Sequence, residues 1–302
     1  MTAHRSLAHW ETTTDCFDVI VVENGSGDAS ARPLGVSVPS VPIVSHLIVN
    51  RENLGFAGGV RSAWTIATGE LICLLSEIAS VRDGTHNVIG TNIWMPLLRT
   101  PDECFTASGV CLLLVRGPAS PPFLAEYFAY LEDVFLRWRL RLLSLGSERV
   151  PSATIYHDGS LAGRAEIDLR SQVAPHAEKN RLTNMSLLNS AESPFRILPL
   201  IILDETKKVL MFLADLLRLR FRRAISYATL NVRARWWILR RFAWISPRRR
   251  EIQSRRSASD ASIFPLMSGR LAMDDSRSGR WLNRLSMSYC RLAGIRTVEF
   301  DA

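Results

Sequence analysis

Short apolar runs rich in β-branched residues recur in the first third of the chain, and each ends in polar or glycine residues. They are Val19 to Val22, Pro42 to Val49 and the segment "ELICLLSEIAS". A continuous apolar run suits a strand that is buried on both faces, as in a parallel sheet. A segment with helical spacing, Val60 to Thr68, lies between the second and third runs. This alternation predicts an α/β domain with a mostly parallel sheet flanked by helices, in which ligands bind beyond the carboxyl ends of the strands.

The later part of the chain has a different pattern. The segment "FLAEYFAYLEDVFLRWRLRLLSLG" indicates a helix, or a turn followed by a helix, and "RVPSATIYHDGS" indicates a short strand. From Glu166 onward the pattern is mostly helical, and after Pro247 the chain becomes rich in Ser and Arg. We therefore expect an α/β domain over residues 1–165, a basic amphipathic helical region over 166–256 and a poorly ordered tail over 257–302.

The formal net charge of +8 is concentrated in the last third of this 302-residue chain. Such asymmetry indicates an anionic partner for the C-terminal part: a membrane surface, nucleic acid or phosphate. The alternative is a basic surface that is solvated and has no partner. The five cysteines include no C-x-x-C pair and have no His at ligand spacing, which argues against a zinc site. Their number and placement suit a reducing compartment, and no run is apolar and long enough to predict a membrane-spanning helix.

A glycine-rich loop, "NLGFAGGVRSA", follows the second apolar run. It lacks the G-x-G-x-x-G spacing of a dinucleotide fingerprint and has no Gly-Lys-Ser/Thr of a P-loop, so alone it indicates only a structural turn. Two acidic stretches change this interpretation of the glycine-rich loop. "VVENGSGDAS" places Glu23 and Asp28 at a strand end, and "YFAYLEDVFLRWRL" places Glu132 beside Asp133 before a helix.

Together these stretches resemble the family 2 glycosyltransferases, in particular their rhamnosyltransferase-like branch. The ordered segments are "VVENGSGDAS", "NLGFAGGVRSA", "LLSEIA", "ASGVCLLLVR", "YFAYLEDVFLRWRL" and "IYH". Further on, "AEKNRLTNMSL" and "RRREIQSRRSAS" resemble the R-N-r segment and the basic end of that family. The resemblance implies a GT-A-type domain that transfers a sugar from a nucleotide-sugar donor to a saccharide or lipid-linked acceptor, with inversion, in cell-surface polysaccharide synthesis.

The resemblance also implies roles for particular residues. Binding of the nucleotide sugar falls to the strand-end and loop residues Glu23, Asn24, Asp28, Asn53, Gly55, Gly58 and Gly59. Glycines would remove the Cβ atoms that keep a sugar phosphate away from the backbone, whereas Phe56 is expected to be a packing residue. For activation of the acceptor hydroxyl we expect Asp133 to be the base, with Glu132 oriented toward the site. The alternative for this pair is an exposed acidic helix N-terminus.

Several positions depart from the family pattern. Ile78 occupies the place of the Asp that normally holds Mg²⁺ or Mn²⁺ in this family, which leaves Glu77 and His157 as the candidate metal ligands. Arg61 and Phe135 replace a family Asn and Asp, and the usual first strand of the family is absent from the chain. We therefore interpret the chain as a truncated or degenerate copy, for which an inactive membrane-associated binding protein is the second hypothesis.

Apolar stripes alternate with arginine clusters between Leu198 and Trp244. This pattern favours helices that lie in a membrane interface, with arginines toward anionic headgroups, on the cytoplasmic face. The alternative is an amphipathic annex packed on the catalytic domain. Because no nucleic-acid-binding motif is recognisable, we expect no nucleic-acid partner.

Overall fold

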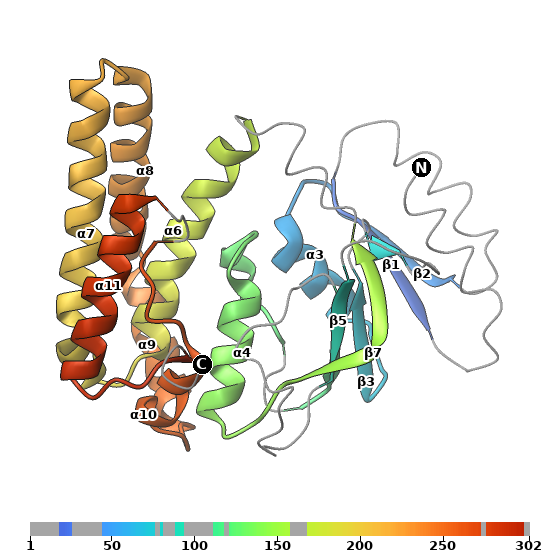
Figure 1. The fold of residues 1–302 in the computed structure, drawn as a ribbon. Helices are drawn as coiled ribbons and strands as arrows, with labels where there is room; N and C mark the ends of the chain where they lie inside the picture. The colour runs from blue at the N-terminus through green and yellow to red at the C-terminus, as the bar shows by residue number, and fades with distance from the viewer. Residues whose placement is uncertain are drawn as a thin grey trace. The chain divides into compact units, whose positions relative to one another are not determined.

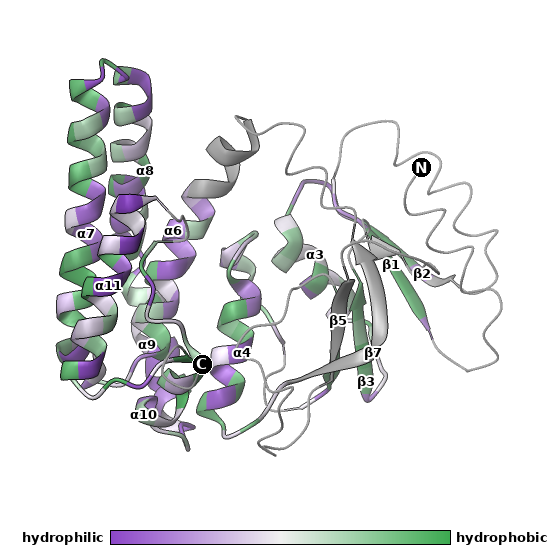
Figure 2. Ribbon diagram, viewed as in Figure 1, coloured by the Kyte–Doolittle hydropathy of each residue, from purple (hydrophilic) through white to green (hydrophobic). Residues whose placement is uncertain are grey.

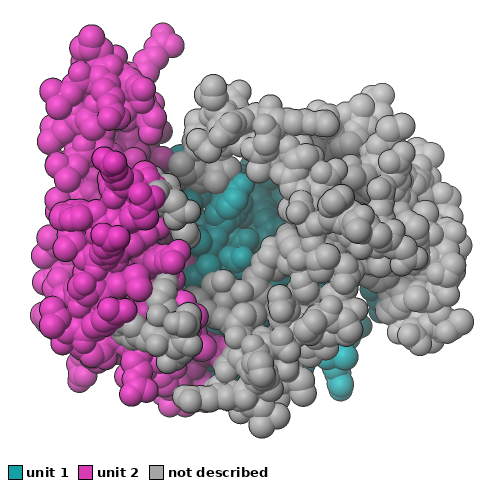
Figure 3. All heavy atoms as spheres, in the orientation of Figure 1, with its two compact units in different colours: residues 1–140, 145–180 teal, residues 141–144, 181–302 magenta. Residues whose placement is uncertain are grey.

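The structure is a computed structural model that describes residues 18–25, 44–75, 79–80, 88–93, 111–117, 121–157, 168–272 and 276–298. It is a mixed α/β protein, mostly helical, with small sheets (Figure 1). The chain divides into two compact units, which Figure 3 colours separately. Unit 1 comprises residues 1–140 and 145–180, and unit 2 comprises residues 141–144 and 181–302.

The first two apolar runs form a parallel pair of strands in unit 1. Strand β1 (Val19–Glu23) pairs with β2 (Val44–Val49), so that Glu23 and Val49 are partners at the carboxyl ends. Helix α3 (Gly55–Trp64) follows, and it packs against β1. The prediction of two parallel strands followed by a helix is confirmed, except that α3 begins five residues before Val60, within the expected glycine loop.

A second sheet of unit 1 is mixed, with strands in the order β3-β6-β5-β7-β4. The strands are β3 (Leu71–Leu75), β4 (Ala79–Ser80), β5 (Val88–Ile93), β6 (Cys111–Val115) and β7 (Glu148–His157). Only the β5–β6 pair is parallel among these five strands, so the expected mostly parallel sheet is wrong for them. Strand β3 is an edge strand that exposes Leu71, and an apolar edge run carries no signal of strand direction.

Two further helices of the described residues begin in unit 1, one after the segment "FLAEYFAY" and one after strand β7. A 3-10 turn, η2 (Ala125–Tyr127), precedes α4 (Glu132–Leu142), as the alternative of a turn followed by a helix predicted. Helix α6 (Asp168–Leu188) contains Pro175. Phe123, Tyr127 and Phe135 are almost fully buried and form part of the core of this unit.

Unit 2 consists of helices. They are α7 (Ser193–Leu217), α8 (Phe221–Arg240), α9 (Phe242–Ser254), α10 (Asp260–Ile263), the 3-10 turn η3 (Phe264–Leu266) and α11 (Arg277–Leu292). Helices α7 and α8 lie side by side as a hairpin (Figure 1). Green and purple residues alternate along both helices in Figure 2, as expected for amphipathic helices.

Structured elements occupy much of the region after residue 257, where we expected a poorly ordered tail. One reason is Asp260, a buried carboxylate that accepts hydrogen bonds from Ser190 N at 2.8 Å, from Ser193 Oγ and from Arg256 Nη1 at 2.7 Å. These bonds hold the pKa of Asp260 below its usual value, although burial alone would raise it. The composition is rich in Ser and Arg, but polar groups that are paired inside the protein favour order.

A small apolar core orders the end of the chain. Phe264, Cys290 and Ile295 are buried together, and Leu200 and Met267 pack against them. Cys290 is therefore a core residue, as is Cys111 in strand β6, whereas Cys73 is exposed with its Sγ 3.9 Å from that of Cys111. Of the helices in the described ranges, none combines the length and apolar character needed to cross a bilayer.

Candidate functional site

The side chain of Asn24 joins the end of β1 to the start of α3. Its Nδ2 donates to the Gly55 carbonyl at 2.8 Å, and its Oδ1 accepts from Asn50 Nδ2 at 2.9 Å and from Leu54 N at 3.3 Å. Both polar atoms of this amide are thus bonded within the protein. The sequence predicted a nucleotide contact here, and the geometry gives Asn24 a structural task in shaping the loop.

Two further predicted residues lie beside Asn24. Asn53 Oδ1 accepts from Gly55 N at 2.8 Å, which closes an Asx-type turn before α3. The Glu23 side chain is 5% exposed, and its Oε2 accepts from Gly25 N at 3.1 Å. The structure therefore brings Glu23, Asn24 and Asn53 together at the carboxyl ends of β1 and β2, the edge that the sequence predicted.

Three glycines at the start of α3 lie close to other parts of the protein. Gly55 has φ +69°, and a Cβ built on it would lie 2.4 Å from the Phe128 carbonyl oxygen. A Cβ on Gly58, already inside α3, would lie 2.5 Å from Leu54 Cβ, and one on Gly59 would lie 3.3 Å from Asn24 Nδ2. Packing against neighbouring protein atoms thus accounts for the small residues without a ligand.

A strained turn precedes α4 and lies against the N-terminus of α3. Phe128, Tyr130 and Leu131 all have positive φ, between 61° and 68°. Phe128 has ψ −74°, and Ala129 N donates to the Tyr127 carbonyl at 2.7 Å, which defines a γ-turn of the rare form with positive φ. The Phe128 carbonyl accepts from Ala57 N at 2.9 Å, so the turn satisfies an N–H of the first helical turn of α3.

Two residues of α6 fix this turn. Asn180 Nδ2 donates to the carbonyls of Tyr127 and Ala129, each at 2.9 Å, and of Tyr130 at 2.5 Å. Lys179 Nζ donates to the Glu126 carbonyl. We call Lys179 and Asn180 the carbonyl clamp, since together they engage four backbone oxygens of the turn.

His176, one helical turn before the carbonyl clamp, stacks on the Phe128 ring with centroids 4.6 Å apart. Burial lowers the pKa of His176, and the nearby charge of Lys179 lowers it further, so the imidazole is favoured in its neutral form. Neither His176 nor the carbonyl clamp was predicted as part of the site. The only signal in the sequence was the resemblance of "AEKNRLTNMSL" to a family segment.

Glu132 follows the turn directly and begins α4. Its side chain is 7% exposed, and Oε2 is a buried oxygen without a hydrogen-bond partner among the described residues. Burial, with a contribution from the neighbouring Asp133, raises the pKa of Glu132 to about 7. Complete burial raises the pKa of Tyr127 well above its usual value, and the negative charges of Glu132 and Glu126 raise it further.

The residues next to Glu132 have different environments. Asp133 is partly exposed, and its Oδ1 accepts from Val134 N at 2.7 Å, in the manner of a residue at a helix N-terminus. Phe135 is 1% exposed and packs on Tyr127 with ring centroids 5.2 Å apart. Of the two adjacent carboxylates, Glu132 is therefore the buried one, with the strongly raised pKa.

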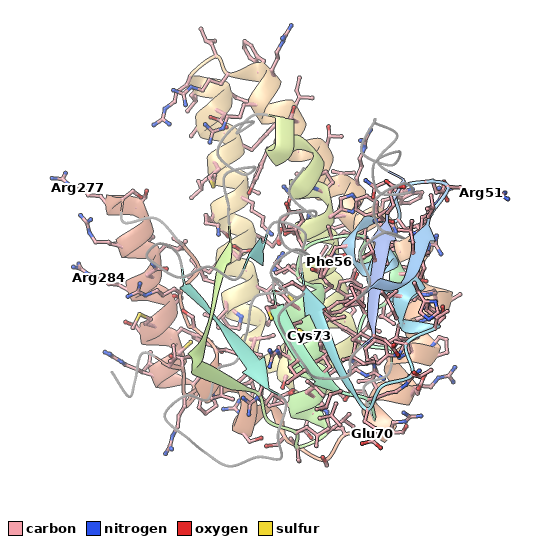
Figure 4. The ribbon with its side chains drawn as sticks, turned by 90° about the vertical axis from the view of Figure 1, so that its right-hand side faces the viewer. Arg51, Phe56, Glu70, Cys73, Arg277 and Arg284 are labelled. Carbon is pink, nitrogen blue, oxygen red and sulfur yellow. The ribbon has the colours of Figure 1, made fainter. Side chains whose placement is uncertain are left out.

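Only some of the remaining predicted positions lie within the described residues. Asp28, Glu77 and Ile78 lie outside the described residues, as does the side chain of His157, whose backbone ends β7. No group of three or more potential metal ligands occurs among the residues that the structure does describe. Phe56 packs on Phe123 with ring centroids 5.7 Å apart, which confirms its expected packing role, whereas Arg51 extends away from the loop (Figure 4).

The glycine-containing start of α3 lies beside the carboxyl ends of β1 and β2, and the strained turn that is bonded to it leads into the buried carboxylate of Glu132. A carboxylate with a pKa near 7 can accept a proton at neutral pH. Comparisons with protein-family models, with curated proteins and with solved structures found no match to this chain.

Proposed function

We propose that the chain is an inverting glycosyltransferase with a GT-A-type domain. It would move a sugar, rhamnose or a similar hexose, from a nucleotide-sugar donor to a saccharide or lipid-linked acceptor in cell-surface polysaccharide synthesis. The observation that carries the proposal is the buried Glu132 carboxylate at the start of α4, next to a strained turn bonded to α3. The ordered resemblance of six sequence segments to family 2 glycosyltransferases supplies the reaction class.

In the proposed reaction the acceptor oxygen forms a bond to the anomeric carbon of the donor sugar. The bond from that carbon to the diphosphate oxygen breaks at the same time, and its electron pair leaves with the nucleoside diphosphate. The hydroxyl proton passes to a carboxylate, for which a pKa near the working pH is most effective. The sequence favoured Asp133 for this role, whereas burial and pKa favour Glu132.

A divalent ion, Mg²⁺ or Mn²⁺, would neutralise charge on the departing diphosphate. The side chain of Ile78 has no atom that can coordinate a metal, so Glu77 and His157 are the remaining candidate ligands from the sequence. The proton transfer assigned to Glu132 is independent of which of these residues, if either, holds the ion.

The test measures nucleoside diphosphate release by the full chain from several UDP- and dTDP-sugars with Mg²⁺ or Mn²⁺ present. We expect Glu132→Gln to lower the rate about a hundredfold or more, and Asp133→Asn to lower it much less. The wild-type rate should rise with pH through about 7, and Asp133→Asn should keep this profile. Equal background release by the wild type and Glu132→Gln would refute the proposed reaction.

A second candidate is a catalytically inactive relative that acts as a membrane-associated binding protein on the cytoplasmic face. It is favoured by the internal hydrogen bonds of Asn24, whose amide is bonded to Asn50, Leu54 and Gly55. In that case no donor would release a nucleoside diphosphate above background, and binding to lipid vesicles would persist.

A further inference from the structure

The turn between α7 and α8 exposes large apolar side chains among arginines. We call residues 217–223, "LRLRFRR", the basic tip. The side chains of Leu217, Leu219 and Phe221 are 85%, 74% and 52% exposed. In Figure 1 the tip lies at the end of the α7–α8 hairpin away from α9 and α10, so the described parts of unit 2 leave it uncovered.

The backbone conformation of the tip is unfavourable for a leucine at position 219. Arg220 N donates to the Asp215 carbonyl at 2.8 Å and Leu219 N donates to the Leu216 carbonyl at 3.0 Å, the two bonds of a Schellman motif. Leu219 occupies the position after the helix cap with φ +56°, where glycine is strongly preferred. A leucine here adopts an unfavourable backbone conformation and also exposes its side chain to water.

The charge of the tip is strongly positive. Its four arginines are all exposed, and the carboxylate of Asp215 is bonded to one of them, with Arg223 Nε 3.1 Å from Asp215 Oδ2. Helix α8, residues 221–240, contains no acidic residue. Positive charge around exposed apolar side chains is complementary to a surface that is anionic outside and apolar beneath.

We propose that the basic tip inserts Leu217, Leu219 and Phe221 into the interface of an anionic phospholipid bilayer, with its arginines at the headgroups. A nucleic acid would match the charge, but it offers no apolar phase to leucine side chains. A bilayer matches both. The insertion holds the end of the α7–α8 hairpin at the membrane, and it does not depend on the reaction proposed above.

The test uses flotation of the full chain with vesicles of phosphatidylcholine alone or mixed with phosphatidylglycerol. We expect binding only to the mixed vesicles, and Leu219→Gly should need about tenfold more lipid for half-maximal binding. The melting temperature of Leu219→Gly should be unchanged or higher, because glycine suits φ +56°. As a matched control, Leu292→Ser removes a leucine that is 89% exposed at the end of α11 and should bind as the wild type does.

A second variant tests the charges. Arg222→Glu should weaken binding to mixed vesicles, and added salt should weaken binding of the wild type more than binding of this variant. Vesicle binding by Leu219→Gly equal to that of the wild type would overturn the proposal. The choice of a bilayer would be overturned if a duplex DNA bound the wild type and if Leu219→Gly weakened DNA binding by the same factor as vesicle binding.

Discussion

Two turns in the described part of the chain hold large apolar or aromatic residues at positive φ, and they do so by different means; the smaller Ser144, after α4, is a further residue with positive φ. In unit 1, the turn before α4 contains Phe128, Tyr130 and Leu131, and side chains of α6 bond its carbonyls. In unit 2, the basic tip contains Leu219, and the backbone bonds of the helix end, Leu219 N to Leu216 O and Arg220 N to Asp215 O, hold it. The first turn has a polar network built around it, whereas the second has its unfavourable residue in water.

The two turns differ in what surrounds their strained residues. A residue in a sparsely populated backbone region persists only when its surroundings determine it, and such residues cluster at functional sites. In unit 1 the surroundings are the carbonyl clamp and the N-terminus of α3, and the strained residues lead directly into Glu132. In unit 2 nothing in the described structure requires a leucine at position 219. We therefore propose that this leucine contacts a partner, the anionic bilayer.

The largest expected effect is that of Gly55→Ala. The change adds a Cβ 2.4 Å from the Phe128 carbonyl oxygen and forces alanine to φ +69°, so we expect a loss of about 4 kcal/mol in unfolding free energy. Urea denaturation measures it. Gly294→Ala is the matched control, because Gly294 has φ +62° with no atom within 4 Å of the added Cβ, and about 1 kcal/mol is expected. An equal loss of unfolding free energy in both variants would mean that the contact between Phe128 and the start of α3 leaves no constraint on a side chain at position 55.

The next effect is that of Asn180→Ala, which removes the donor to three carbonyls of the strained turn. We expect a loss of about 2 kcal/mol, since the two N–H groups of the amide are shared among these carbonyls and each contributes about 1 kcal/mol. Asn231→Ala is the control, because Asn231 bonds the Tyr227 carbonyl within helix α8, and it should change stability by less than about 0.5 kcal/mol. If both asparagine variants unfold at the same urea concentration as the wild type, the clamp does not hold the turn.

Glu132→Gln should raise stability at high pH. The folded-state pKa of Glu132 is raised from 4.5 to about 7, so between these values the folded state holds a proton that the unfolded state has lost. Stability therefore falls as pH rises through this window, by about 3 kcal/mol in all. Glutamine removes this loss and costs about 1 kcal/mol as a buried amide, which leaves a gain of about 2 kcal/mol at pH 8.

The comparison for this variant is made across pH. Below pH 4.5 the gain should vanish, because the carboxyl group is then neutral in both the folded and unfolded states. Glu251→Gln, which changes an exposed side chain, should alter stability little at any pH. A Glu132→Gln protein with the same pH profile as the wild type would show that the carboxylate is solvated.

The smallest effect is that of Leu219→Gly on stability alone. Because the residue is exposed and already at φ +56°, glycine should stabilise the helix end by about 1 kcal/mol. The melting temperature measures this gain. A loss of stability would show that Leu219 packs within unit 2, and the contrast between the two turns would fail.

The sequence predicted the local parts of this structure. The β-branched run Val19 to Val22 and the next apolar run predicted β1 and β2, and the acidic pair before "VFLRWRL" predicted the start of α4. These signals are local, since they depend on side-chain periodicity and on the preference of carboxylates for helix N-termini. The start of α3 was displaced, because Gly55 and Gly58 indicated a loop while their role is close packing.

The parts that were not predicted depend on residues far apart in the chain. Asn180 bonds carbonyls about fifty positions earlier, and nothing in the composition of α6 indicates that partner. The antiparallel pairing of β3 with β6 likewise depends on long-range register. That Glu132 is buried while Asp133 is partly exposed depends on tertiary packing, which two adjacent acidic residues in a sequence do not indicate.

Two buried cysteines, one in each unit, allow the local opening of each unit to be measured by thiol alkylation. Cys111 in β6 is 2% exposed and Cys290 in α11 has no exposed surface, so a thiol reagent reaches either sulfur only when its surroundings open. The rate at which each sulfur is alkylated therefore records the local opening of its own half of the chain under native conditions. One mass-spectrometric time course can thus follow the two units separately without any engineered label.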